Sequence, residues 1–477
     1  MKSTYLLLSM FFMTWMTLVS HAQVSSDANM PPLPKRDVMS QAYWDLWNDD
    51  VQKGIDDRIE RYRKANATVF LTDVKPGTDV KIEQISHEFL FGASIFNFNQ
   101  LGAKEIDDKY KAIFGDLLNS ATIPFYWSQL EMDRGTVRYE TCAEDNPDFW
   151  AKSKDPTAER FWRRPATDQI VDFCEGKGIF SHGHTLIWGN RNHGVPKWMK
   201  TEPGDVDEME KLAAARLLSI AQRYGDRIKR WDVVNESATD KLNPHHSKYD
   251  PNDPKGNYGV MPRDYTYKAF KYVDEIFPKS AILSINDYDM GFGYINQVAD
   301  LRIRGCRVDM AGLQMHLFNP KQCADIAQGA KIQHPEHLLN LMNEFGKLGI
   351  PLHLSEITIT APNDDPDGRE IQANITRNLY RMWFSWPDMA AITWWNLVDG
   401  CGLKGEPTTS GICSRQMEKK PAYDALDRLI NHEWKTKIVA KAEESRFKHQ
   451  FRGFKGTYQI SWTDVNGNAR TAEIDVK

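Results

Sequence analysis

The chain has 477 residues, a formal net charge of −5 and 26% charged residues. This length allows one large domain of roughly 300 or more residues with a small appendage. The charges are dispersed and no long basic run is present, which excludes an extended nucleic-acid-binding track.

The N-terminus has the pattern of a secretory signal peptide. Lys2 precedes an apolar stretch from Tyr5 to Val19, and Ser20-His21-Ala22 offers small residues at the two cleavage positions. We expect residues 1–22 to be removed and the mature protein to be secreted or periplasmic. No later segment approaches the roughly 18 consecutive apolar residues of a membrane span, so none is expected.

Residues 23–85 form an N-terminal flank. The charged pattern from Ala42 to Ala65 predicts a helix. Residues 68–74 and 80–84 alternate apolar and polar residues around a Lys-Pro-Gly turn, which predicts a β-hairpin. Residues 433–477 return to the same alternation, with a turn at Asn466-Gly467. We expect the two flanks to pair into a small β-subdomain.

Between residues 86 and 432, short apolar runs alternate with amphipathic segments. The candidate strands are Phe89–Ile95, Ala121–Phe125, Phe180–Trp188, Ile228–Asn235, Ile282–Asn286, Met310–Met315, Leu352–Glu356 and Ala391–Leu397. Candidate helices between them include Val206–Tyr224, Tyr265–Phe277, Pro335–Leu348 and Arg369–Ser385. This alternation predicts an α/β fold, a (β/α)8 TIM barrel. A doubly wound open sheet is the alternative, but no phosphate-binding glycine loop follows the first strand.

Polar residues stand at the C-terminal ends of these strands, where the active site of such a barrel lies. Two of the strands run straight into glutamates, Glu236 and Glu356. Two carboxyl groups on different strands are the minimum equipment for cleaving a glycosidic bond with an acid and a nucleophile. The other strand ends supply His184, Trp188, Asn235, Asn286 to Tyr288, Gln314, His316 and Trp394 to Asn396.

From about residue 86 to 430 the chain resembles glycoside hydrolase family 10, the family best known for endo-β-1,4-xylanases. The matching motifs are Gly183-His184-Thr185-Leu186-Ile187-Trp188, Trp231-Asp232-Val233-Val234-Asn235-Glu236, Ile285-Asn286-Asp287-Tyr288, Gly312-Leu313-Gln314-Met315-His316, Leu354-Ser355-Glu356-Ile357 and Lys420-Pro421-Ala422-Tyr423. The resemblance implies that Glu236 is the general acid/base and Glu356 the nucleophile of a retaining mechanism. Two nearby carboxylates do not easily both ionise, so Glu236 is expected to hold its proton near neutral pH.

The same resemblance assigns substrate-binding roles. It implies that His184 and Trp188 line the −1 pocket, that Trp395 is a stacking floor, and that Tyr288 lies on the leaving-group side. Asn235 is expected to bond the sugar 2-hydroxyl. Gln314 belongs to the same set, and His316 on its strand is expected to hold Glu356 in line. His182 is expected to be structural.

The chain departs from the family pattern on the glycone side of the cleavage point. Thr122-Ile123-Pro124-Phe125-Tyr126-Trp127 stands where the family carries Glu-Asn-x-x-Lys-Trp, and Gly189 replaces the usual histidine. Asp399-Gly400-Cys401-Gly402 stands in place of a second tryptophan. We therefore expect a divergent −2 subsite, rebuilt by segments 142–164 and 243–258. Candidate substitutes are Tyr126, Trp127, Arg163 and His193.

Of the six cysteines, Cys401 and Cys413 are the most plausible disulfide pair. None has metal-site spacing, and we expect no metal and no cofactor. The acidic loop Asn363–Gly368 could hold calcium, although a solvated turn is favoured.

The sequence thus predicts a secreted, monomeric endo-β-1,4-xylanase acting on xylan or decorated xylan, with no nucleic-acid partner. One alternative is the same mechanism on another β-linked polysaccharide or oligosaccharide. The other is a catalytically silent carbohydrate-binding protein, which the presence of both glutamates disfavours.

Overall fold

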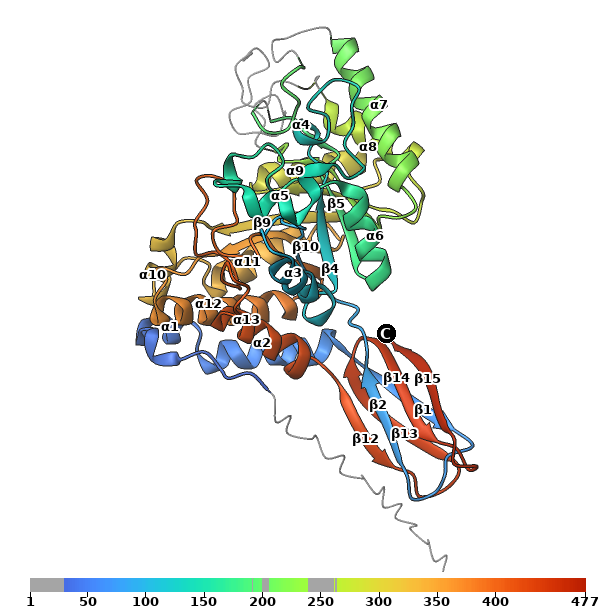
Figure 1. Ribbon diagram of the computed structural model, residues 1–477. Coiled ribbons are helices and arrows are strands. Elements are labelled where there is room, and N and C mark those ends of the chain that lie inside the picture. Colours follow the sequence, from blue (N-terminus) through green and yellow to red (C-terminus); the bar gives the residue numbers. More distant parts are fainter. Residues whose placement is uncertain (1–29, 191, 200–205, 239–260, 262–263) are drawn as a thin grey trace, which may run out of the picture.

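A computed structural model describes residues 30–477 except 191, 200–205, 239–260 and 262–263. The barrel stands above a β-sandwich, and the N-terminal helices α1 (Gln41–Leu46) and α2 (Asp49–Tyr62) lie at the end of the barrel that faces the sandwich (Figure 1). The expected signal peptide, residues 1–22, and the segment 243–258 lie outside the described residues.

Eight parallel strands close into a barrel. In hydrogen-bonding order they are β5 (Phe180–His184), β4 (Ser120–Pro124), β3 (Leu90–Ser94), β11 (Met389–Trp394), β10 (Leu352–Ile359), β9 (Met310–Leu317), β8 (Ile282–Asp287) and β7 (Arg230–Asn235). The pairing of β5 with β7 closes the ring, and the short strand β6 (Ile187–Trp188) continues along β7. Every predicted strand is present, so the barrel is confirmed and the open sheet excluded. Strands β4, β7 and β10 are buried at every residue, as parallel strands covered on both faces are.

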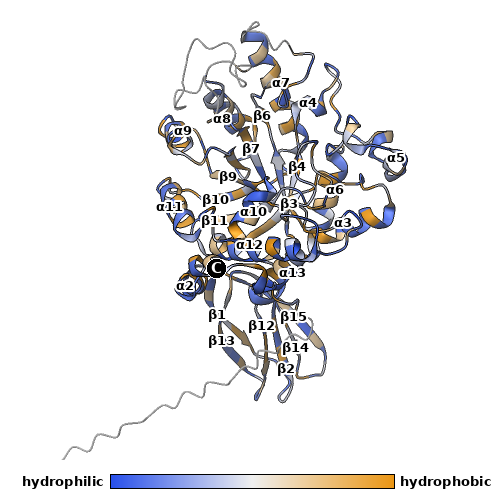
Figure 2. Cartoon of the chain, turned by 90° about the vertical axis from the view of Figure 1, so that its left-hand side faces the viewer, coloured by the Kyte–Doolittle hydropathy of each residue, from blue (hydrophilic) through white to orange (hydrophobic). Residues whose placement is uncertain are grey.

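Helices surround the strands (Figure 2). One helix follows each barrel strand: α3 (Lys104–Asp116), α6 (Thr167–Lys177), α7 (Val206–Tyr224), α8 (Tyr265–Ile276), α9 (Phe292–Ile303), α11 (Pro335–Gly346), α12 (Pro366–Ser385) and α13 (Pro421–Asp427). Short helical segments lie in the connections: Arg36–Val38, α4 (Trp127–Leu130), Ala143–Asp145, α5 (Pro147–Lys152), Pro156–Ala158, α10 (Pro320–Ala327) and Arg428–Glu433. Within the described chain, no helix combines the length and apolar character that crossing a membrane requires.

The acidic loop before α12 is a helix cap. Asp365 Oδ1 accepts a hydrogen bond from the Gly368 N–H at 2.7 Å, and Asn363 Nδ2 donates to Asp365 Oδ2 at 2.7 Å. Such an aspartate satisfies one of the free N–H groups of the first helical turn. No cluster of His, Cys, Asp or Glu that could hold a metal ion is present among the described residues.

The expected helix from Ala42 to Ala65 is interrupted. Asn48 accepts a hydrogen bond from the Val51 N–H at 3.1 Å and starts α2 as a separate helix. The last two residues of the expected helix already belong to β1 (Lys64–Leu71). Helix α2 packs on α12, where Arg381 Nη2 lies 2.6 Å from Asp56 Oδ1, so this flank is attached to the barrel.

The flanking strands form a β-sandwich, but not through the expected hairpin. Strand β1 pairs antiparallel with β13 (Phe447–Phe454) in a two-stranded sheet. Strand β2 (Asp79–Gln84) lies in a separate sheet of order β12 (Lys437–Lys441), β2, β14 (Gly456–Thr463) and β15 (Ala469–Val476). Both sheets contribute to one core that contains Val69, Ile82 and Ile460. The hairpin prediction was wrong because alternation marks the buried face of a strand and not its neighbour. The predicted pairing of the two flanks is confirmed.

The predicted disulfide between Cys401 and Cys413 was also wrong. All six cysteines are free thiols, and these two are buried. Burial raises the pKa of Cys401 to about 11 and that of Cys413 to about 12, so both remain protonated at neutral pH. The Cys413 backbone pairs with Val398, and Cys401 and Cys413 form no bond with each other.

Gly183 on β5 has no room for a side chain. A Cβ atom at this position would lie 2.2 Å from Cζ3 of Trp231, which is fully buried. We expect Gly183→Ala to lower the free energy of unfolding by about 1–3 kcal/mol through overpacking. Gly176→Ala in α6, where no atom lies within 4 Å, is the control and should leave stability unchanged or raise it by up to about 1 kcal/mol. Equal denaturant midpoints for the two variants would contradict this account.

Candidate active site

A cavity of about 670 Å³ is lined by residues at the C-terminal ends of the barrel strands. It brings together the nine side chains that the sequence analysis selected: His184, Trp188, Asn235, Glu236, Tyr288, Gln314, His316, Glu356 and Trp395. They come from seven different strands or the residues that directly follow them. Convergence on one cavity follows from the barrel, in which all carboxyl ends of the strands face one side.

Glu356 on β10 is held from both sides of its carboxylate. The side chain is 5% exposed. Asn286 Nδ2 donates to Oε1 at 2.7 Å, and His184 Nε2 lies 3.7 Å from the same oxygen. His316 Nε2 lies 3.4 Å from Oε2, the contact that the sequence analysis expects. The Asn286 hydrogen bond and the two neighbouring imidazoles fix the direction of the carboxylate.

Asp232 sets the orientation of His184. Its Oδ2 lies 2.8 Å from His184 Nδ1 and 2.8 Å from His182 Nε2. Burial alone would lower the pKa of His184, but the hydrogen bond to Asp232 and the charge of Glu356 together raise it. Burial of Asp232 would raise its pKa. The charges and hydrogen bonds of His182 and His184 outweigh this effect and hold the pKa of Asp232 well below its ordinary value. His182 is buried and does not line the cavity, consistent with a structural role.

Glu236 directly follows β7 in a left-handed backbone conformation. Its φ is +55°, which costs a non-glycine residue about 1 kcal/mol, and its N–H donates to the Asn286 carbonyl at 2.7 Å. Trp188 Nε1 donates to Oε2 at 3.1 Å and Gln314 Nε2 to Oε1 at 3.3 Å. Burial, and then the negative charge of Glu356, raise the pKa of Glu236 to about 7.

Asn286 links the two glutamates, although the sequence analysis gave it no role. Its Nδ2 lies 2.9 Å from Asn235 Oδ1 as well as near Glu356, while its carbonyl receives the Glu236 N–H. Its position could have indicated a role, since Asn286 lies near the C-terminal end of β8, where the other site residues lie on their strands. Asn235 is buried beside it, with Gln314 Nε2 3.4 Å from its oxygen.

Aromatic rings form the walls of the cavity. Trp395 packs edge-on against Phe96 at 5.1 Å between centroids. His193 stacks on Trp188 at 6.1 Å, and Phe318 stacks on His316 at 4.3 Å. Tyr288 is 48% exposed and stands open to solvent. Flat rings around buried carboxyl groups suit a ligand with both apolar CH faces and hydroxyl edges.

The four expected substitutes divide into two pairs. Tyr126 and His193 line the cavity. Trp127 does not, because its indole N–H donates to Glu131 at 2.8 Å. Arg163 does not either, because its Nη1 donates to the Cys401 carbonyl at 3.0 Å. Arg160, Trp162 and Arg164, from the segment 142–164 that was expected to rebuild the cleft, also line the cavity, as do Leu403 and Glu406, which the sequence did not single out.

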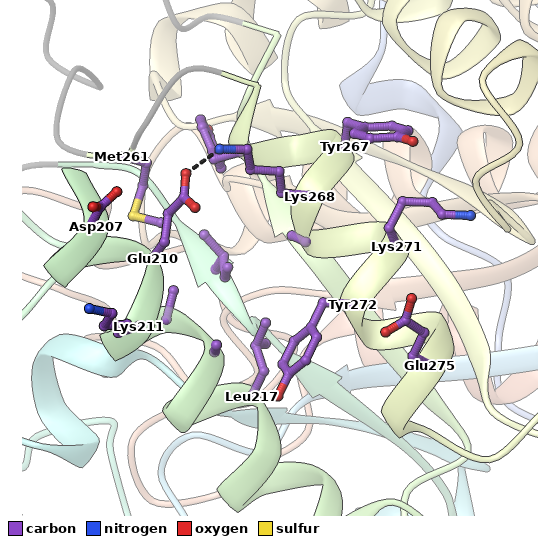
Figure 3. A pocket seen from close by; sticks show the side chains of 15 residues that line it. Asp207, Glu210, Lys211, Leu217, Met261, Tyr267, Lys268, Lys271, Tyr272 and Glu275 are labelled. Carbon is purple, nitrogen blue, oxygen red and sulfur yellow. Dashed lines mark hydrogen bonds and ion pairs between the residues drawn. The ribbon is translucent and has the colours of Figure 1, made fainter.

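A second cavity of about 610 Å³ lies between α7 and α8 (Figure 3). Its charged side chains include Lys268 and Glu210, which form an ion pair with each other. It contains none of the strand-end carboxyl groups, so the cavity at the strand ends is the candidate active site.

The model of the family described as Glycosyl hydrolase family 10 matches residues 133–428. Endo-1,4-beta-xylanase B of Thermotoga neapolitana is 26% identical over 294 residues, which cover 59% of this chain and 78% of that protein. Endo-1,4-beta-xylanase A of Xylanibacter ruminicola is 30% identical over 193 residues, which cover 37% of this chain and 49% of that protein. In structure, native xylanase 10B from Thermotoga maritima is similar with a TM-score of 0.56 and 19% identity, covering 72% of this chain and 96% of that one. At that identity the structural likeness supports the fold alone.

Proposed function

This chain belongs to glycosyl hydrolase family 10, and from that premise we propose that it cleaves β-1,4-linked xylan, plain or decorated, by retaining double displacement. The observation that supports the proposal is that two glutamates line one cavity and that their carboxyl groups have different neighbours. Glu356 has Asn286 against one carboxylate oxygen and His316 near the other, whereas Glu236 has a pKa raised to about 7 and so holds a proton at slightly acidic pH. Different environments for two carboxyl groups are what separates a nucleophile from an acid.

In the first step Glu356 attacks the anomeric carbon while Glu236 gives its proton to the glycosidic oxygen. The bond between the anomeric carbon and the glycosidic oxygen breaks, and the anomeric carbon forms a covalent bond with one carboxylate oxygen of Glu356. His316 and Asn286 hold the carboxylate in line for this attack, since each approaches a different oxygen. Trp188 and Gln314 hold the acid.

In the second step Glu236, now ionised, takes a proton from water, and the resulting hydroxide displaces Glu356 from the anomeric carbon. The raised pKa of Glu236 fits both directions of proton transfer near neutral pH. Asn235, buried beside Asn286, is the donor or acceptor for the sugar 2-hydroxyl. The signal-peptide pattern of residues 1–22 further supports action outside the cytoplasm, in the periplasm or beyond the cell.

Product analysis tests the proposal. We expect purified protein to release xylo-oligosaccharides from at least one of plain, arabinose-decorated or glucuronate-decorated xylan, and proton NMR should detect the β-anomer first. Release of α-anomers would exclude the retaining mechanism. Cleavage of another β-glycan only would keep the mechanism and replace the substrate. No product from any of these glycans would favour the carbohydrate-binding alternative.

A further inference from the structure

One end of the active-site cavity is rich in arginine, and we call it the arginine end. It consists of Arg160, Trp162, Arg164, Leu403 and Glu406. The first three belong to the connection between β4 and α6, and the other two follow β11. Two hydrogen bonds fasten these segments together, because Trp162 Nε1 donates to the Gly402 carbonyl at 3.0 Å and Arg163 Nη1 to that of Cys401 at 3.0 Å.

Arg164 is a buried cation that forms no ion pair with any described residue. It is 8% exposed, and its Nη1 donates to the Arg163 carbonyl at 2.7 Å. Its Nε has no hydrogen-bond partner among the described residues. Burial lowers the pKa of Arg164 to about 10, so the side chain remains charged at neutral pH. A buried charge is costly unless an opposite charge joins it, which makes Arg164 a receptor for an anion.

Glu406 fills this role only in part, although its negative charge raises the pKa of Arg164. Its Oε2 accepts hydrogen bonds from Asn396 Nδ2 at 3.0 Å and from the Leu403 N–H at 2.9 Å, and it forms no ion pair with Arg164. Arg163 adds to the positive charge behind the wall, since its Nε and Nη2 are buried without partners among the described residues.

Tyr126 separates Arg164 from the two glutamates. The guanidinium carbon of Arg164 lies 3.8 Å from the centre of the Tyr126 ring, and that ring lies 5.3 Å from the His184 ring. His184 in turn approaches Glu356. The rings of Tyr126 and His184 therefore lie between Arg164 and Glu356, which places Arg164 beside a neighbouring sugar and not beside the one that is attacked.

We propose that the arginine end binds the carboxylate of a uronic acid carried by the sugar chain next to the cleavage point. This inference rests on the proposed function, because it names the substrate class of the same site. The planar guanidinium of Arg164 matches a carboxylate in shape and charge, and charge-assisted hydrogen bonds in a desolvated pocket discriminate strongly. Arg160, which is exposed on the same wall, attracts the same anion.

The test compares two oligosaccharides that differ in one group. Glucuronate-bearing xylo-oligosaccharides are used as such and after reduction of the carboxyl to an alcohol. We expect kcat/KM to be about 10- to 100-fold higher for the acidic form. Arg164→Met, which keeps the apolar stem over Tyr126, should reduce this ratio to below about threefold. Arg164→Lys should give an intermediate ratio, since it keeps the charge without the fork.

Arg446→Met, which removes an exposed arginine of the β-sandwich, is the matched control for net charge and should keep the ratio of the unmodified protein. Calorimetry with Glu356→Gln gives a second readout that does not depend on the folding of Arg164 variants, and the acidic form should bind about 10-fold or more tightly. Equal kcat/KM values or equal affinities for the two oligosaccharides would overturn the inference while leaving the proposed function intact. Absence of turnover together with preferential binding of the acidic form would overturn the proposed function alone.

Discussion

Glu356→Ala is expected to lower kcat on xylan by at least about 10⁴-fold. No neighbour replaces the lost nucleophile, because Asn286, His184 and His316 surround the carboxylate with donors and offer no anionic oxygen. Initial rates of reducing-sugar release measure the effect, and calorimetry with the oligosaccharide product should still detect binding. Glu443→Ala, an exposed glutamate of the β-sandwich, serves as the control.

Adding azide to Glu356→Ala should yield a product that identifies Glu356 as the nucleophile. The space left by the Glu356 carboxylate admits a small anion, which can attack the anomeric carbon while Glu236 protonates the leaving oxygen. The product is a glycosyl azide of inverted configuration, since one displacement has taken the place of two. More than about 1% residual xylan cleavage by Glu356→Ala, or an azide product of retained configuration, would assign the nucleophile to another residue.

The barrel could be predicted from the sequence because its strands are buried on both faces. Strands β7 and β10 are buried at every residue, and Glu236 and Glu356, toward their C-terminal ends, mark the active-site face. This is why the nine selected side chains meet in one cavity. Strand β10 nevertheless continues three residues beyond Glu356, to Ile359, because residues after the glutamate are still paired with β9.

The arginine end could not be predicted in the same way. Arg160 and Arg164 lie in a connection that has no period of 2 or 3.6 to indicate which side chains face the cavity. The sequence does not distinguish Arg163 from Arg164, because they are adjacent arginines and only their backbone conformation decides which side chain faces the cavity. Arg163 has a φ of +58°, and this turn sends its side chain to Cys401 and leaves Arg164 on the cavity wall.

Asp232 shows a signal that sequence reasoning can use. It lies in the middle of β7, where a polar residue interrupts an otherwise apolar run, and it is fully buried. A buried carboxylate needs partners, and here they are His182 and His184. The interruption therefore predicts a buried polar network below the catalytic residues, and such residues orient the histidine that touches Glu356.

Glu236→Ala is expected to lower kcat/KM on xylan by about 10²- to 10⁴-fold, the usual contribution of a general acid. The loss should nearly vanish for an aryl xyloside with a strongly acidic phenol, because that leaving group departs without a proton. The slope of log kcat/KM against phenol pKa should therefore be steeper for Glu236→Ala than for the unmodified protein. An equal loss on all leaving groups would show that Glu236 binds substrate and does not donate the proton.

The pH profile tests the same role through the environment of Glu236. Burial and the charge of Glu356 raise the pKa of Glu236 to about 7, so the acid form is present below that pH and is lost above it. The value of kcat/KM reports the free enzyme and should fall tenfold per pH unit above about 7. Glu236→Gln has no proton to lose and should show no such decline on the activated aryl xyloside. A decline that persists in Glu236→Gln would place the titrating group elsewhere, with His184 next in line because it lies between Asp232 and Glu356.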